Sequence, residues 1–172
     1  GATINLNKES ELYATAGHQQ DSETVPIVAT SANVLSADGL TVNGGKLIAI
    51  VGGQTTLKNS TVKATSTDAN ITVASGTSFS LETNSDYAGK SSEDQVATRT
   101  ADPSNVTTLI GTTVQNADNG EIHIDGGRTI VDNSKLTSED TVIVAAVTKE
   151  VSDESDLTKN VSEGNTVTLK NG

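Results

Sequence analysis

The chain has 172 residues, a formal net charge of −11 at pH 7, 33% hydrophobic residues, 2% aromatic residues and no cysteine. This length suits one domain, and the lack of cysteine excludes disulfides and thiolate metal sites. The acidic balance argues against nucleic-acid or anionic-membrane partners, which are held by cationic surfaces. Low hydrophobicity with high charge is also typical of disorder, but regularly spaced β-branched residues favour a folded, β-rich chain.

No apolar stretch reaches the roughly 18 residues that a membrane-spanning helix requires. The longest apolar run is Leu47–Val51, with the sequence LIAIV. The chain starts with Gly-Ala, lacks methionine and is rich in Ser, Thr and Asn. We therefore expect a processed protein that is extracellular or displayed on the cell surface, without a membrane span.

Residues 1–23 are expected to form an N-terminal strand followed by a polar linker. Ile4 and Leu6 fall on one face of the strand, and the linker ends in the polar sequence GHQQDSE. Such a strand either caps its own sheet or acts as an arm that adds to the open sheet edge of a neighbouring subunit. Residues 24–172 are expected to form a single β-rich domain, in which Pro26 restricts the first strand to an edge or a first rung.

Apolar residues recur at intervals of 22 or 23 from Asp38 onwards. This period predicts an all-β, three-sided parallel solenoid of about 22 residues per rung, in which equivalent residues of successive rungs stack. About eight rungs would fit in 172 residues at that period. The pairs expected to stack are Ile48 with Ile71, Ile50 with Val73, Leu40 with Val62, Leu57 with Phe79, Val114 with Leu136, and Ile122 with Val144.

Three stretches carry a generic resemblance to a known kind of fold: LTVNGGKLIAI, TTLKNSTVKA and ANITVASGTSFSLE. They cover roughly residues 33–83, and the pattern continues more weakly over 106–147. In these stretches the chain resembles the right-handed parallel β-helices of secreted adhesins and bacteriophage tail proteins. Within TTLKNSTVKA, Asn59 is expected to turn the chain at a corner and to pair with a neighbouring rung. The resemblance implies a type of fold and no activity.

An antiparallel β-sandwich or jelly roll of pilin type, with a donor-like N-terminal strand, is the alternative. Asn43-Gly44 and Asn119-Gly120 each lie between β-prone runs. Asn-Gly is the strongest short-range hairpin signal, because a type I′ turn requires positive φ at both central residues. Strands of seven residues joined by tight turns would also produce a 22-residue period. We prefer the solenoid.

Two runs are apolar at every position: Leu47–Val51 and Val142–Val147. A strand with one face in water would alternate, so both runs should be covered on both faces. The cover would be another layer of the same chain or a neighbouring subunit. The residues that we expect to take part in assembly are Ile4, Leu6, Leu47, Ala49 and Val51.

Residues 84–104 break the β pattern and are expected to be a loop insertion, the kind of segment that often carries recognition. Turn residues around Asp118 and Asp125 offer oxygen ligands for calcium, but turn chemistry also explains them and their spacing does not match an EF-hand loop. His18 and His123 have no assignable catalytic partner and are expected to be solvated. The sequence therefore predicts no metal, no cofactor and no enzyme.

The sequence favours a structural subunit of an extracellular or cell-surface fibre, sheath or layer. Its partners would be other copies of itself, joined by β-strand edges into a homopolymer. The alternative is an adhesin or phage receptor-binding module that recognises a glycan or host protein through residues 84–104.

Overall fold

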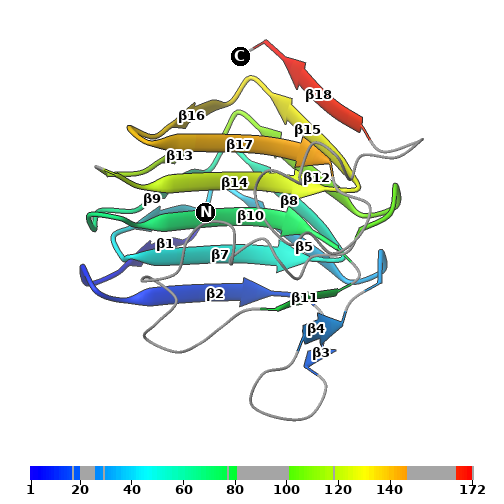
Figure 1. The fold of residues 1–172 in the computed structure, drawn as a ribbon, viewed down its shortest axis with the longest axis horizontal. Coiled ribbons are helices and arrows are strands. Elements are labelled where there is room, and N and C mark those ends of the chain that lie inside the picture. The colour runs from blue at the N-terminus through cyan, green and yellow to red at the C-terminus, as the bar shows by residue number, and fades with distance from the viewer. Residues whose placement is uncertain are drawn as a thin grey trace.

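The fold is that of a computed structural model of the whole chain, which describes residues 1–16, 18–19, 26–28, 30–76, 78–80, 101–117, 119–146 and 166–171. None of these residues is helical. Three parallel sheets of five strands each form the sides of a three-sided stack (Figure 1). The preferred β-solenoid is therefore confirmed, and the antiparallel sandwich is wrong for this stack.

Each side of the stack takes one strand from every rung. Sheet I contains β1 (Thr3–Asn5), β6 (Thr41–Asn43), β9 (Thr61–Lys63), β13 (Thr113–Gln115) and β16 (Lys135–Thr137). Sheet II contains β2 (Glu11–Thr15), β7 (Leu47–Gly52), β10 (Asn70–Ser75), β14 (Glu121–Gly126) and β17 (Thr141–Ala146). Sheet III contains β5 (Val34–Asp38), β8 (Gln54–Lys58), β12 (Val106–Ile110), β15 (Arg128–Asp132) and β18 (Thr166–Lys170).

The chain passes from sheet I to II to III in every turn, which gives five rungs. Rung 1 is β1-β2-β5, rung 2 is β6-β7-β8, rung 3 is β9-β10-β12, rung 4 is β13-β14-β15, and rung 5 is β16-β17-β18. This is fewer than the eight or so rungs that would fit in the chain at the predicted period, because three turns contain long excursions. These excursions all leave the corner between sheets II and III, after β2, β10 and β17.

Aliphatic side chains stack in columns along the inside of the three sheets. In sheet II, Ile71 lies between Ile48 and Ile122, and Val73 lies between Ile50 and Ile124. These residues are at most 1% exposed and belong to one continuous core cluster. Aliphatic side chains stacked at the strand spacing of about 4.8 Å fill the interior without large aromatic residues.

The corner between sheets III and I repeats one backbone device. Asn59, Asn133 and Asn171 have φ of 47°, 46° and 50°, and Gly39 and Gly111 have φ of 70° and 57°. Glycine and asparagine are the residues that most readily adopt this left-handed conformation. In rungs 1 to 4 the N–H of the turn residue donates across to the next rung: Asn59 to Ile110 O at 2.9 Å, for example. The predicted corner role of Asn59 is confirmed, and its Nδ2 also donates to Asp38 Oδ1 at 3.0 Å.

The corner between sheets II and III has two forms that alternate along the stack. In rungs 2 and 4 a single glycine, Gly53 or Gly127, separates the two strands. The excursion of rung 1 returns over Gly53, so a Cβ added there would lie 1.6 Å from Thr30 O. The excursion of rung 3 returns over Gly127, where an added Cβ would lie 1.6 Å from Asp102 O. Close approach of another backbone therefore requires glycine at these two corners.

An asparagine ends each of these two returning segments. Asn105 accepts the N–H of Asp102 at its Oδ1, at 2.8 Å, and the N–H of Gly127 at its carbonyl, at 2.9 Å. Its Nδ2 donates to Gly53 O at 3.0 Å, so it also joins the rung on its other side. Asn33 makes the same turn and backbone contacts one repeat earlier. The excursions thus occur with a repeat of two rungs.

Three short strands lie outside the stack: β3 (His18–Gln19), β4 (Pro26–Val28) and β11 (Ser78–Ser80). They form an antiparallel sheet in the order β11-β4-β3, which joins the excursions of rungs 1 and 3. The expected stacking of Phe79 on Leu57 is wrong, because Phe79 is paired with Ile27 of β4 and Leu109 lies next to Leu57.

Candidate functional site

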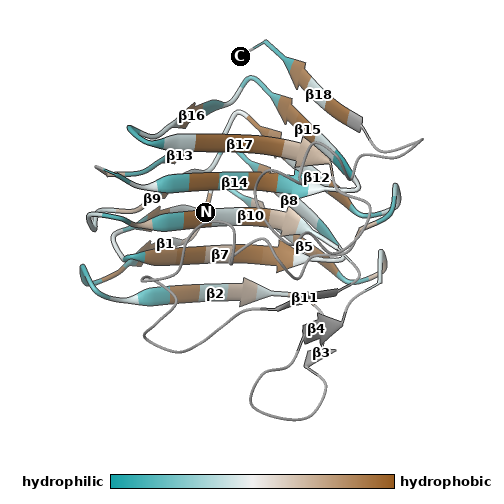
Figure 2. Ribbon diagram, in the orientation of Figure 1, coloured by the Kyte–Doolittle hydropathy of each residue, from teal (hydrophilic) through white to brown (hydrophobic). Residues whose placement is uncertain are grey.

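The open surface of rung 5 is the clearest candidate site. Side chains that point into the core in rungs 2 to 4 are uncovered here: Val142 is 39% exposed, Val167 41% and Leu169 67%. β18 lies at one extremity of the stack, beyond β15, and is hydrophobic along its middle (Figure 2). An exposed aliphatic patch of this kind marks a binding surface more often than scattered surface residues do.

A hollow of about 250 Å³ opens on this end of the stack. Its floor is aliphatic, and Ser134, Lys170 and Asn171 supply polar groups at its margin. The aliphatic residues that line it are Val131, Leu136, Val144 and Leu169. Such a surface binds by burying aliphatic groups, and no histidine, aspartate or glutamate is among the residues that line it.

The backbone of rung 5 is also available. β16, β17 and β18 are the last strands of sheets I, II and III among the described residues, and β1, β2 and β5 are the first. Each therefore has one edge on which no described strand makes ladder hydrogen bonds. A row of backbone N–H and C=O groups at such an edge is a template for another strand.

The predicted assembly residues lie elsewhere. Ile4 and Leu6 belong to the rung 1 end, where they are partly buried against the core cluster. Leu47, Ala49 and Val51 point outward from sheet II and are nevertheless at most 1% exposed in the single chain. The expected cover on both faces of β7 is confirmed, because all six residues from Leu47 to Gly52 are buried. The assembly role of these five residues stays a prediction.

The second apolar run behaves differently. β17 is buried only at its last residues, Ala145 and Ala146, and its pattern of exposure follows from its place in the last rung. The expected cover on both faces is therefore only partial over the first part of this described strand. The sequence pattern could not distinguish β17 from β7, because cover on the inner face depends on whether another rung follows.

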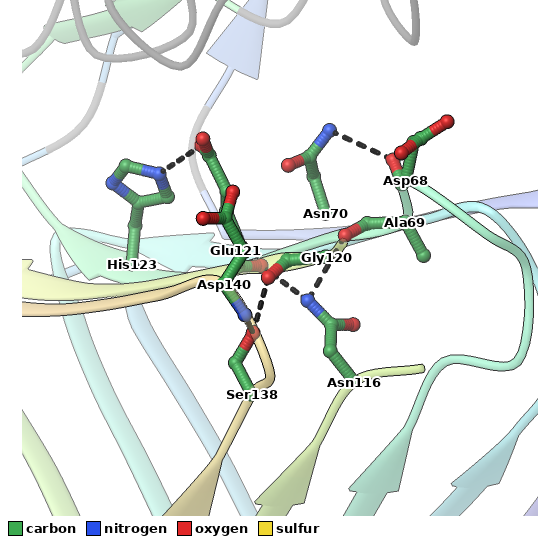
Figure 3. Close-up of polar contacts among 9 residues, drawn as sticks. All are labelled: Asp68, Ala69, Asn70, Asn116, Gly120, Glu121, His123, Ser138 and Asp140. Atoms are coloured by element: carbon green, nitrogen blue, oxygen red, sulfur yellow. Dashed lines mark hydrogen bonds and ion pairs between the residues drawn. The ribbon is translucent and has the colours of Figure 1, made fainter. Parts of the chain in front are cut away.

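His123 is buried on the outward face of β14, so the expectation that it is solvated is wrong. It lies between Thr72 of β10 and Ile143 of β17 in the sheet register. Its Nε2 lies 3.1 Å from Oε2 of Glu121, two residues earlier on the same face (Figure 3). This hydrogen bond orients the ring, and Nδ1 has no hydrogen-bond partner among the described residues. The sequence already indicated that Glu121 and His123, two residues apart in a strand, lie on the same face. Only the fold shows that His123 is buried on that face.

The turn before β14 is explained by hydrogen bonds. Asn116 donates through Nδ2 to Ala69 O at 2.9 Å and also to the carbonyl of Glu121 (Figure 3). Asn119 has a φ of 56°, as a left-handed turn residue does. The hairpin expected at Asn119-Gly120 is wrong, because β13 and β14 belong to different parallel sheets.

The residues considered as calcium ligands do not come together in the part of the chain that the structure describes. Asp118 lies outside that part, and Asp125 is buried within β14, on the same face as His123. Among the described residues no group of three or more His, Cys, Asp or Glu side chains is placed to hold a metal ion. His18 is described only in its backbone, in β3.

No protein-family model, curated protein or solved structure matches the chain. Among the described residues there is no helix that is long and apolar enough to cross a membrane.

Proposed function

We propose that this protein is a non-enzymatic structural subunit of an extracellular or cell-surface assembly, such as a fibre, sheath or layer. It associates with other copies of itself through the edges of its strands. The single observation that carries this proposal is the last rung, where core-type side chains such as Leu169 are exposed beside three strand edges on which no described strand pairs.

Association is favoured energetically because rung 5 exposes aliphatic side chains at positions that the rungs below it bury. Each additional aliphatic side chain that is fully buried contributes about 1.5–3 kcal/mol, and Val142, Val167 and Leu169 are available together. The backbone edges add directional hydrogen bonds, which fix how the partner lies. A contact between two different surfaces of one molecule produces an open filament unless its rotation closes a ring.

The composition supports the proposed location. The chain is rich in Ser and Thr, has no cysteine and has a formal net charge of −11, which favours solubility of a surface rich in small polar residues. The proposal requires no cofactor, nucleic acid or membrane span.

The test is a concentration series of the purified protein, followed by light scattering after size-exclusion chromatography and by negative-stain electron microscopy. We expect the mean mass to rise with concentration and filaments to form. Leu169→Asp should abolish growth, because it places a charge on the exposed apolar end. Thr61→Asp, which adds the same charge to the exposed face of sheet I, should leave growth unchanged. A wild-type protein that stays monomeric at high concentration would contradict the proposal.

The alternative function, an adhesin or receptor-binding module, depends on the insertion at residues 84–104. Most of this segment lies outside the described residues. It stays a prediction that no described contact favours.

A further inference from the structure

We infer that the partner at the open end is a second copy of this chain, stacked head to tail. Rung 1 of one copy lies on rung 5 of the next, in register, so that Lys170 faces Asp38 across the junction. The inference rests on the proposed function, since it specifies the partner, direction and register of that assembly. Three independent observations support it: strand layout, charge and corner geometry.

The two end rungs have matching layouts. Rung 5 presents β16, β17 and β18, and rung 1 presents β1, β2 and β5, each pair from the same side of the stack. All strands of a side run parallel, so a copy shifted along the stack axis continues each sheet without reversal. The inner columns then continue as well, with Leu136 on Ile4, Val142 on Leu12 and Leu169 on Ala37. Ala37 is the smallest of the three rung 1 residues, and it would pack against Leu169, the most exposed of the three rung 5 side chains.

The strands of the two end rungs carry opposite charges. The strands of rung 1 contain the acidic residues Glu11 and Asp38 and no basic residue. The strands of rung 5 contain the basic residues Lys135 and Lys170 and no acidic residue. Two copies that met through identical ends would therefore bring together strands of like charge, whereas head-to-tail contact brings together strands of opposite charge.

The register follows from one outward column of sheet III. Asp38 pairs with Lys58 in rungs 1 and 2, and Asp132 pairs with Lys170 in rungs 4 and 5. The chain therefore twice places aspartate next to lysine at this column. A first rung in register on rung 5 adds a third such pair, Lys170 with Asp38. A shift of two residues along the strand removes it.

The corners between sheets I and II carry charged residues of both signs, so their charges do not select the register. Rung 1 has Lys8 and Glu9 there, and rung 5 has Glu139 and Asp140. Lys8 would be attracted to the two carboxylates and Glu9 would be repelled by them. All four are on the surface, where such contacts contribute little.

The corner between sheets III and I is already shaped for the junction. In this structure the N–H of Asn133 donates to Lys170 O at 3.0 Å, as the N–H of Gly39 does to Lys58 O at 2.9 Å. Asn171 has the same left-handed conformation, with a φ of 50°. In the in-register stack its N–H donates to Asp38 O of the next copy, which extends the ladder by one step.

Cysteine pairing tests direction and register, and the chain is suited to it because it has no cysteine of its own. Ser36 and Thr168 occupy the same outward column of sheet III, in rungs 1 and 5. In the predicted junction their Cα atoms are about 4.8 Å apart, within the range of a disulfide, whereas Thr166 would be displaced by two residues. The single variants Ser36→Cys, Thr168→Cys and Thr166→Cys are purified separately and mixed in pairs under mild oxidation.

We expect disulfide-linked dimers in the mixture of Ser36→Cys with Thr168→Cys, and at least about tenfold fewer in Ser36→Cys with Thr166→Cys or in either variant alone. Thr168→Cys linking to itself, or Thr166→Cys linking best, would overturn the inference while the mass series still shows assembly. A protein that never associates would overturn the proposed function as well. The two failures are therefore distinguishable.

Charge variants provide the second test. Lys170→Glu should weaken association about threefold to tenfold, since it replaces an attraction to Asp38 with a repulsion. Lys135→Glu makes the same charge change on rung 5 but faces Thr3, so it should have a smaller effect. Lys170→Ala distinguishes pairing from edge protection, a common role of lysine on edge strands. Pairing predicts weaker association for Lys170→Ala, and stronger association would contradict the inference. Thermal unfolding of each variant at low concentration checks that the fold is intact.

Discussion

The middle rungs and the last rung use the same positions of the repeat with opposite results. In one inner column of sheet III, Leu57 and Leu109 are fully buried and Val131 is 6% exposed, whereas Leu169 is 67% exposed. The residue type and the strand are equivalent throughout. Only the presence of a following rung differs, so in a solenoid the neighbouring rung, and not the residue itself, makes a side chain part of the core.

A second column shows the same contrast with a polar residue. Thr55, Thr107 and Thr129 are buried, and each donates its hydroxyl to a carbonyl of sheet II in the rung above, at 2.6–2.7 Å. Rung 5 has Val167 at this position. A buried hydroxyl requires a partner, and the partner here is supplied by the next rung.

The largest expected effect comes from shortening an aliphatic side chain in the middle. Leu109→Ala should lower the free energy of unfolding by about 2–5 kcal/mol, because it leaves a cavity between two rungs. Leu169→Ala, the same change in the same column of rung 5, should cost less than about 1 kcal/mol. Urea denaturation of dilute protein measures both. Equal losses would mean that rung 5 is covered within the monomer.

A methyl group at a tight corner should have the next largest effect. Gly127→Ala places a Cβ 1.6 Å from Asp102 O, so the returning segment of rung 3 must move. The expected loss is about 1–3 kcal/mol, as for other overpacked sites. Thermal unfolding monitored by circular dichroism measures it. An unchanged midpoint would show that residues 101–105 do not hold this corner closed.

Removing one buried hydroxyl should cost less. Thr129→Val keeps the shape of the side chain but removes the hydrogen bond to Ala145 O, which should cost about 1 kcal/mol. The reverse change at the open end, Val167→Thr, should alter stability by less than about 0.5 kcal/mol, since the surface is solvated. Both values come from urea denaturation. A cost for Val167→Thr as large as that for Thr129→Val would contradict the comparison.

The smallest effect is expected at the corner between sheets III and I. Gly111→Asn should change stability by less than about 0.5 kcal/mol, because asparagine already holds the same conformation at Asn59 and Asn133. Gly111→Val is the matched control and should cost about 1–2 kcal/mol, since a β-branched residue is strained at a φ of 57°. Thermal unfolding of the two variants separates backbone strain from added volume.

The expected stacking was correct for three of the six pairs. Ile48 with Ile71, Ile50 with Val73, and Val114 with Leu136 are neighbours in adjacent strands. Three expectations failed for local reasons. Leu40 lies in a corner, so Val42 stacks on Val62 in its place. Leu57 lies beside Leu109 because an excursion separates their two rungs in the sequence. Ile122 lies beside Val142 because the chain between them has a shorter turn. A mean period cannot locate corners or excursions.

The sequence by itself determined that the chain is all-β, and the 22-residue period of its aliphatic residues favoured a parallel stack while leaving an antiparallel sandwich open. It also determined the corner at Asn59, since few residues tolerate positive φ. Only the tertiary structure decided the number of rungs, the burial of His123 and the exposure of Leu169. These depend on what lies above or beside a strand, and contacts between distant segments leave no signal in local spacing. The open last rung, from which the proposed assembly follows, is therefore a property of the stack as a whole.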